Sequence, residues 1–169
     1  FNALWNWSKT YLYHSSPTDP SCHFFSWEAK TNGQTMSEFV APDGESYYVM
    51  ALYFAANRWG NGSGIYNYRR QAYELLSAMR HRALIRGKMF LMWGKTMRIL
   101  EVTSGPLVSE APKMILFSTS NERPHFPAPS NQLPAFYELW ARWGHAADSN
   151  FWMYAASASR KFFWHVANT

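Results

Sequence analysis

The sequence is poor in the residues that build disulfides and metal sites. Its 169 residues include a single cysteine, Cys22, which excludes an intrachain disulfide and a cysteine-based metal cluster. The six histidines are scattered and none forms a His-x-x-x-His pair, so a structural zinc ion is not expected. No run of about 18 apolar residues is long enough to span a bilayer. We therefore expect no metal, no cofactor and no membrane partner.

Charged residues are also few, at 16% of the chain, whereas aromatic residues make up 18%. The chain is 47% apolar and has the length of one globular domain, so residues 1–169 are expected to form a single domain. Most of the rings can be explained by an aromatic-rich helical core. So many Trp and Tyr also suit a carbohydrate groove, where ring faces stack on sugars while polar tips hydrogen-bond hydroxyl groups.

The net charge is +5, and much of the basic charge lies between Arg58 and Arg98. A basic run raises nucleic-acid binding as a candidate function. No recognisable nucleic-acid motif accompanies it, so we interpret the run as a solvated face and expect no nucleic-acid partner.

The two ends of the sequence are not typical of natural termini. The chain has no initiator Met, and Phe1 already begins a helical pattern of apolar residues. Its last residues, up to Val166 and beyond, carry no evident helix stop. We therefore expect an internal piece of a longer protein.

The stretch from Ala41 to Trp59 carries the strongest helix signal. Pro42 disfavours a helical conformation before it, and Asp43 offers a carboxylate to the first free N–H groups. Glu45 adds negative charge to the first turn, where the helix dipole favours it. The two acids then have two interpretations, as an N-cap with a first-turn acid or as carboxylates that bind a substrate.

Other segments follow from apolar periodicity and from turn residues. The pattern predicts an extended segment at 23–27, a turn at Asn32-Gly33, and strands or extended segments within 86–122. It predicts a loop from Arg123 to Pro134. Helices are expected at about residues 4–12, 42–58, 66–84, 134–143 and 149–166.

Several blocks of the sequence are distinctive, and one of them reads Ala-Pro-Asp-Gly-Glu-Ser-Tyr-Tyr from Ala41. The blocks are Leu4–Tyr11, Phe24–Trp27, Ala41–Gly60, Gly64–Tyr68, Leu133–Trp140 and the helix containing Phe151-Trp152. Together they resemble glycoside hydrolase family 8, and within it the reducing-end xylose-releasing exo-oligoxylanases. The likeness covers roughly residues 1–80 and 113–169, whereas the basic stretch 80–112 matches poorly.

The resemblance implies an all-α fold, here part of an (α/α)6 barrel with long loops and possibly a short β-hairpin within 86–122. It also implies hydrolysis of β-1,4-linked xylo-oligosaccharides, or of related glucans, with inversion. One carboxylic acid then protonates the leaving oxygen while a carboxylate about 6.5–9.5 Å away activates water. Such an enzyme is expected in the cytoplasm if it processes oligosaccharides, and outside the cell if it cleaves polysaccharides.

Carried over residue by residue, the resemblance places Asp43 on the family's groove aspartate, which binds and helps to distort the sugar at the cleavage point. Trp27 falls on the sugar-stacking tryptophan, with core packing as its alternative. Glu45 and Tyr47 are further candidates for substrate binding. The family's general acid would precede Phe1 and its general base would follow Thr169, so this chain alone is expected to be inactive.

One block departs from the family pattern. Residues 128–131 read Ala-Pro-Ser-Asn, where relatives have Asp-Pro-Ser-Tyr and the tyrosine helps to hold the attacking water. Asn131 can still hydrogen-bond, but its side chain is shorter. The departure leaves an alternative function open, that of a catalytically dead carbohydrate-binding relative.

Overall fold

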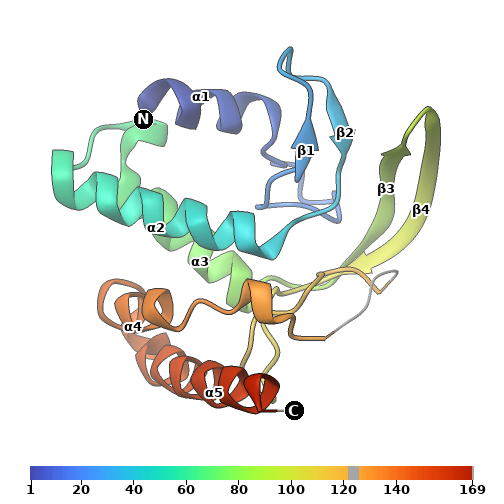
Figure 1. Cartoon of the computed structure of the whole chain (residues 1–169). Coiled ribbons are helices and arrows are strands. Elements are labelled where there is room, and N and C mark those ends of the chain that lie inside the picture. Colours follow the sequence, from blue (N-terminus) through green and yellow to red (C-terminus); the bar gives the residue numbers. More distant parts are fainter. Residues whose placement is uncertain (122–125, 169) are drawn as a thin grey trace.

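The computed structural model describes residues 1–121 and 126–168, and within them helices surround most of the core while a small sheet lies to one side (Figure 1). The expected loop from Arg123 to Pro134 therefore begins outside the described residues. The elements are α1 (Asn2–Tyr11), β1 (Glu28–Ala29), β2 (Thr35–Ser37), α2 (Pro42–Trp59), α3 (Tyr68–His81), β3 (Ile85–Trp93), β4 (Thr96–Ser104), α4 (Pro134–Trp143) and α5 (Ser149–Ala167), with short 3-10 helices at Gly64–Tyr66, Pro129–Asn131 and Ala146–Asp148.

Helices α2 to α5 pack as two consecutive pairs, α2 against α3 and α4 against α5, as Figure 1 shows. Trp140 of α4 and Trp152 of α5 are completely buried, with ring centroids 4.9 Å apart in an edge-to-face arrangement. The Trp140 indole N–H also points at the Met50 sulfur, at 3.0 Å, and so joins the second pair to α2. Each expected helix is present, with ends that differ by a few residues from those predicted.

Helix α2 starts at Pro42, because the preceding Ala41 is extended (φ −108°, ψ 106°). Ala41 is the N-cap residue and makes no side-chain cap, so the prediction that Asp43 is the N-cap is wrong. The Asp43 carboxylate nevertheless accepts the N–H of Gly44 at 2.9 Å, within the first turn. The helix ends at Trp59, and its C-cap Gly60 has a φ of +77°, which suits a residue without a side chain.

The expectation of an all-α fold is wrong in one respect, because four antiparallel strands form a sheet in the order β1-β2-β3-β4. Strands β3 and β4 make a long hairpin whose register pairs Ile85 with Ser104 and Trp93 with Thr96. Alternate residues Met89 and Leu91 are buried with Val102 against Phe39, as the two-residue period of a strand requires. The hairpin expected as a possibility within 86–122 is therefore confirmed, and it is longer than expected.

Arg82 holds the loop before β1 and the end of the hairpin onto α3. One guanidinium nitrogen donates to the carbonyls of Pro20 and Cys22, at 2.7 and 3.0 Å, and another donates to that of Gly105 at 2.8 Å. Only 8% of Arg82 is exposed, so the prediction that the basic stretch is a solvated face is wrong for this residue. Among the described residues, no helix combines the length and the hydropathy needed to cross a membrane.

Asp148 joins the α4–α5 pair to the end of α3. Its carboxylate accepts the Arg80 Nε–H at 2.8 Å and lies 2.7 Å from Nε2 of His81. Burial alone would raise the pKa of Asp148, but the hydrogen bonds from Arg80 and His81 outweigh burial and lower the pKa below its ordinary value.

We predict that Asp148→Asn lowers the free energy of unfolding by about 2 kcal/mol near neutral pH, because it leaves Arg80 with a weaker partner in a buried site. Since the folded pKa is depressed, the stabilisation is present above the unfolded pKa of about 3.9 and is lost as pH falls through the folded pKa. Urea denaturation of both proteins at several pH values measures the difference. Glu74→Gln, which removes the exposed Arg70–Glu74 pair, is the control and should cost under about 0.5 kcal/mol. An equal loss in both variants would contradict the prediction.

Candidate functional site

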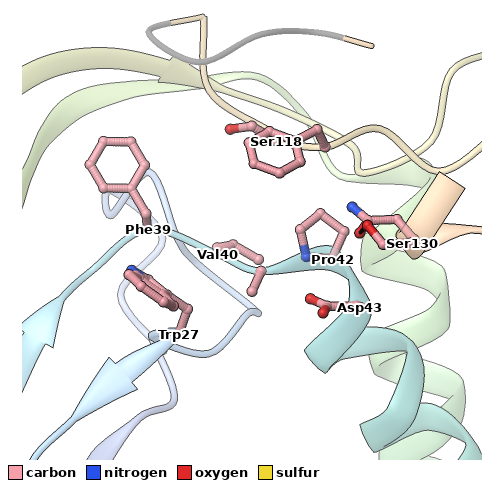
Figure 2. Close-up of a pocket in the computed structure, with 10 residues that line it drawn as sticks. Trp27, Phe39, Val40, Pro42, Asp43, Ser118 and Ser130 are labelled. Carbon is pink, nitrogen blue, oxygen red and sulfur yellow. Dashed lines mark hydrogen bonds between the residues drawn. The ribbon is translucent and has the colours of Figure 1, made fainter. Parts of the chain in front are cut away.

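A cavity of about 290 Å³ lies at the N-terminal end of α2. Figure 2 shows Trp27 on one side, Asp43 and Pro42 at the start of α2, and Ser118 and Ser130 on the far side. Separate stretches of chain meet there: Trp27 just before β1, the segment 39–43 that leads into α2, and the loops before α4. The lining residues are Trp27, Phe39, Val40, Ala41, Pro42, Asp43, Phe117, Ser118, Ser130 and Asn131.

Asp43 is exposed at the mouth of α2, in the second position of the helix. The first turn of a helix carries free N–H groups and a positive partial charge, which favour an ionised carboxylate there. One Asp43 oxygen accepts the Gly44 N–H, and the carboxylate points toward the space in front of Trp27 (Figure 2). An ionised carboxylate in this position can accept hydrogen bonds from hydroxyl groups of a ligand.

Trp27 forms the opposite wall, with 53% of its surface exposed. It directly precedes β1, and its backbone N–H donates to the Phe39 carbonyl at 3.0 Å. Phe39 is itself buried against the hairpin, so the segment that carries Trp27 is attached to the sheet. The indole is therefore held at the cavity rather than packed in the core, the alternative considered for it.

Phe117 provides another aromatic surface, which the sequence analysis did not single out. Its ring is 40% exposed and lies parallel to that of Phe126, with centroids 5.5 Å apart and an interplanar angle of 4°. The Phe117 N–H also donates to the Phe126 carbonyl at 2.8 Å. The sequence signal was only an apolar run at 114–117, because the partner ring lies in a different segment.

Asn131 lines the cavity from the short 3-10 helix Pro129–Asn131, although its side chain is almost buried. Its amide oxygen accepts the Ser130 hydroxyl at 3.2 Å, and its amide nitrogen lies 3.4 Å from the Leu116 carbonyl. The side chain thus orders the loop that forms this wall.

Glu45 and Tyr47 do not line this cavity. Glu45 is only 1% exposed, and one of its carboxyl oxygens accepts the Phe25 N–H at 2.9 Å. Residues two apart on a helix point about 200° apart, so Asp43 and Glu45 cannot face the same side. Tyr47 is one turn beyond Asp43 and is exposed, with its ring edge-on to Phe136 at 5.5 Å.

The arrangement of charges limits the chemistry of the cavity. Among the described residues that line it, Asp43 alone is acidic. Inverting hydrolysis of a glycosidic bond requires two carboxyl groups on opposite sides of the sugar. Within residues 1–121 and 126–168, no three His, Cys, Asp or Glu side chains are grouped so that they could hold a metal ion. The described residues can therefore bind and orient a polar ligand, but they lack a carboxyl pair at this site.

No family model matches the chain. It is 36% identical over 162 residues to the reducing-end xylose-releasing exo-oligoxylanase Rex8A of Paenibacillus barcinonensis, across 96% of this chain and 37% of that protein. The corresponding exo-oligoxylanase of Halalkalibacterium halodurans is 34% identical over 163 residues, again across 96% of this chain and 37% of its own length. The chain thus spans a little over a third of the curated relatives that it matches.

Solved structures agree with these relatives. A GH8 protein from Teredinibacter turnerae in complex with xylobiose superposes with a TM-score of 0.86 and 41% identity, over 96% of this chain and 40% of that one. Rex8A with bound xylose superposes with a TM-score of 0.75 and 36% identity, over 94% of this chain and 37% of that one. The resemblance that the sequence blocks predict is confirmed.

We predict that Glu45 makes stability depend on pH in the opposite sense to Asp148. Burial raises the pKa of the Glu45 carboxyl well above its ordinary value, while the Phe25 N–H and the charges of Arg82 and Lys9 oppose the shift and that of Asp43 adds to it. The folded chain therefore retains a proton that the unfolded chain releases above about pH 4.3, and the free energy of unfolding falls as pH rises toward the folded pKa.

The matched measurement compares wild type with Glu45→Gln by urea denaturation between about pH 4.5 and pH 7. Wild type should lose stability relative to the Gln variant as pH rises. Glu28→Gln, which removes an exposed carboxylate from β1, is the control. A wild type that gains stability over Glu45→Gln with rising pH would show that the sign is wrong.

Proposed function

We propose, on the premise of the resemblance to glycoside hydrolase family 8, that this chain supplies part of the sugar-binding groove of an inverting hydrolase. Its substrates would be β-1,4-linked xylo-oligosaccharides or related β-1,4-glucans. The helix pairs would then be part of an (α/α)6 barrel, with the cavity at one end of the ring. Relatives named as xylose-releasing enzymes, and a related structure with bound xylobiose, support this substrate class.

The observation that carries the proposal is that Asp43 and Trp27 line one cavity from two different elements. An ionised carboxylate beside an exposed indole is suited to a sugar, which presents hydroxyl groups at its rim and C–H groups on its faces. In the proposed complex the ring stacks on Trp27, and Asp43 accepts hydrogen bonds from its hydroxyl groups. Phe117 offers a second apolar face within the same cavity.

Asp43 would act by binding and orienting the sugar at the cleavage point. Interactions that favour a distorted ring over the relaxed one lower the barrier, because they are strongest in the transition state. The proton transfers would need a general acid and a general base, and the described residues place no such carboxyl pair at this cavity. We place both in sequence that precedes Phe1 and follows Thr169.

The catalytic part of the proposal predicts different behaviour for this chain and for a longer protein that contains it. A longer protein that supplies the missing Glu and Asp should release xylose from xylotriose, as measured by chromatography of the products. The 169-residue chain should release none. Asp43→Asn in the longer protein should lower kcat/KM by about a hundredfold or more, since it removes charge where the transition state is bound.

Asn131→Tyr in the longer protein tests the departure from the family pattern. An increase in kcat would support a role for this position in holding the attacking water. Binding of xylotriose without turnover in the longer protein and in Asn131→Tyr would instead favour the carbohydrate-binding relative.

The binding part predicts that Trp27→Ala weakens the affinity of the chain for xylotriose by about tenfold, because a stacked aromatic contact contributes roughly 0.5–1.5 kcal/mol beyond its buried area. Isothermal titration calorimetry measures the dissociation constants. Trp164→Ala removes another exposed indole, near the end of α5, and is the matched control. Equal affinities of wild type and Trp27→Ala would remove Trp27 from the site.

A further inference from the structure

We propose that Glu45 is a positioning residue, whose buried carboxyl group ties the helix that carries Asp43 to the segment that carries Trp27. The inference rests on the proposed function, which gives Asp43 and Trp27 their roles in sugar binding. It adds a residue that lies outside the cavity and acts by holding Trp27 in place relative to Asp43.

The segment Phe24–Trp27 is held by all four of its backbone N–H groups. Phe24 donates to the Ser21 carbonyl and Ser26 to the Leu12 carbonyl, each at 2.9 Å, and Trp27 donates to the Phe39 carbonyl at 3.0 Å. The N–H of Phe25 instead donates to the Glu45 carboxyl, at 2.9 Å. Of the four acceptors, Glu45 alone is a side chain, and it alone belongs to α2.

The Phe25 ring is also held in place, by contacts with other aromatic rings. It stacks on Tyr48 of α2, with centroids 4.3 Å apart and an interplanar angle of 27°, and it contacts Trp5 and Tyr13 at 5.8 and 5.2 Å. The ring and the amide together fix the position and the rotation of this residue. Trp27 follows two residues later, so its place at the cavity depends on the anchor at Phe25.

A buried carboxyl group at position 45 is less favourable than an apolar side chain would be if the residue served packing alone. Burying a carboxyl group is unfavourable unless hydrogen bonds offset the lost hydration. Its Oε1 has the Phe25 N–H, but Oε2 has no hydrogen-bond partner among the described residues. An apolar side chain of similar length would fill the space without this cost, but it would leave the Phe25 N–H unpaired. The geometry therefore points to the link between the two segments as the task of Glu45.

Two substitutions separate the link from the packing. Glu45→Gln keeps an oxygen that can accept the Phe25 N–H, whereas Glu45→Met keeps the length and removes a strong acceptor. We expect xylotriose affinity within about twofold of wild type for the Gln variant and about fivefold weaker for the Met variant. Calorimetric titration of both proteins, after circular dichroism confirms that they fold, gives the comparison.

A double-mutant cycle distinguishes positioning from general destabilisation. If Glu45 acts through Trp27, Glu45→Met should cost almost no further affinity once Trp27 has been replaced by Ala. Losses that add in the double variant would overturn the proposal, as would a Met variant that binds like wild type.

A spectroscopic measurement keeps the inference testable if xylotriose fails to bind, an outcome that counts against the proposed function alone. In protein labelled with 5-fluorotryptophan, the ¹⁹F resonance of Trp27 is assigned by its disappearance in Trp27→Phe. We expect this resonance to shift or broaden in Glu45→Met and to keep its wild-type position in Glu45→Gln. A resonance unchanged in the Met variant would overturn the proposal.

Should Glu45→Met fail to fold, hydrogen exchange of the wild-type chain decides the question. We expect the Phe25 amide to be protected as strongly as the core amides of α2, since its acceptor is a side chain of that helix. A Phe25 amide that exchanges as fast as those of exposed loops would show that the link does not hold.

Discussion

The helical period separates two acids at the start of α2, and the organisation of the site depends on this constraint. Asp43 and Glu45 are two residues apart, so when one faces the cavity the other must face the core. Asp43 remains exposed at the helix mouth, whereas Glu45 is buried and hydrogen-bonded to the Phe25 amide. A single turn of helix thus provides an exposed carboxylate at the cavity and a buried carboxyl group that accepts the Phe25 N–H.

The sheet and the buried Arg82 also hold segments of the cavity wall in place. Phe39 packs on Met89 and Leu91 of the hairpin, while its carbonyl accepts the Trp27 N–H. Arg82 donates to carbonyls on both sides of this unit, in the loop before β1 and at the end of the hairpin. Since these anchors are hydrogen bonds to backbone groups, they fix the course of the chain whatever side chains the loops carry.

Much of the helical structure could be predicted from local signals, because Pro42, Gly60 and the apolar stripe between them act within the same segment. The approach of Trp27 to Asp43 came from the family resemblance rather than from periodicity. The sequence motif groups Glu45 with the substrate-binding candidates, although the helical period places it on the other side from Asp43.

The remaining features depend on partners that are distant in sequence. From the sequence alone the hairpin is only a possibility, since short apolar runs broken by glycine do not reveal whether another strand is available to pair with them. The basic stretch gave no sign that Arg82 is buried, because its acceptors lie in the Pro20–Cys22 loop and at Gly105. Phe117 gained significance only with the parallel ring of Phe126 beside it.

The division of labour within the proposed enzyme follows from the charges at the cavity. The described residues give the cavity one carboxylate and two aromatic faces, a set that can bind a sugar but cannot both donate and accept the protons of an inverting reaction. Binding and orienting a sugar depend on rigidly placed side chains. The residues that anchor the cavity wall, such as Phe39 and Glu45, lie within the described part of the chain. Proton transfer in the proposed enzyme would need two carboxyl groups at a defined separation, a pair that the described residues do not place at the cavity.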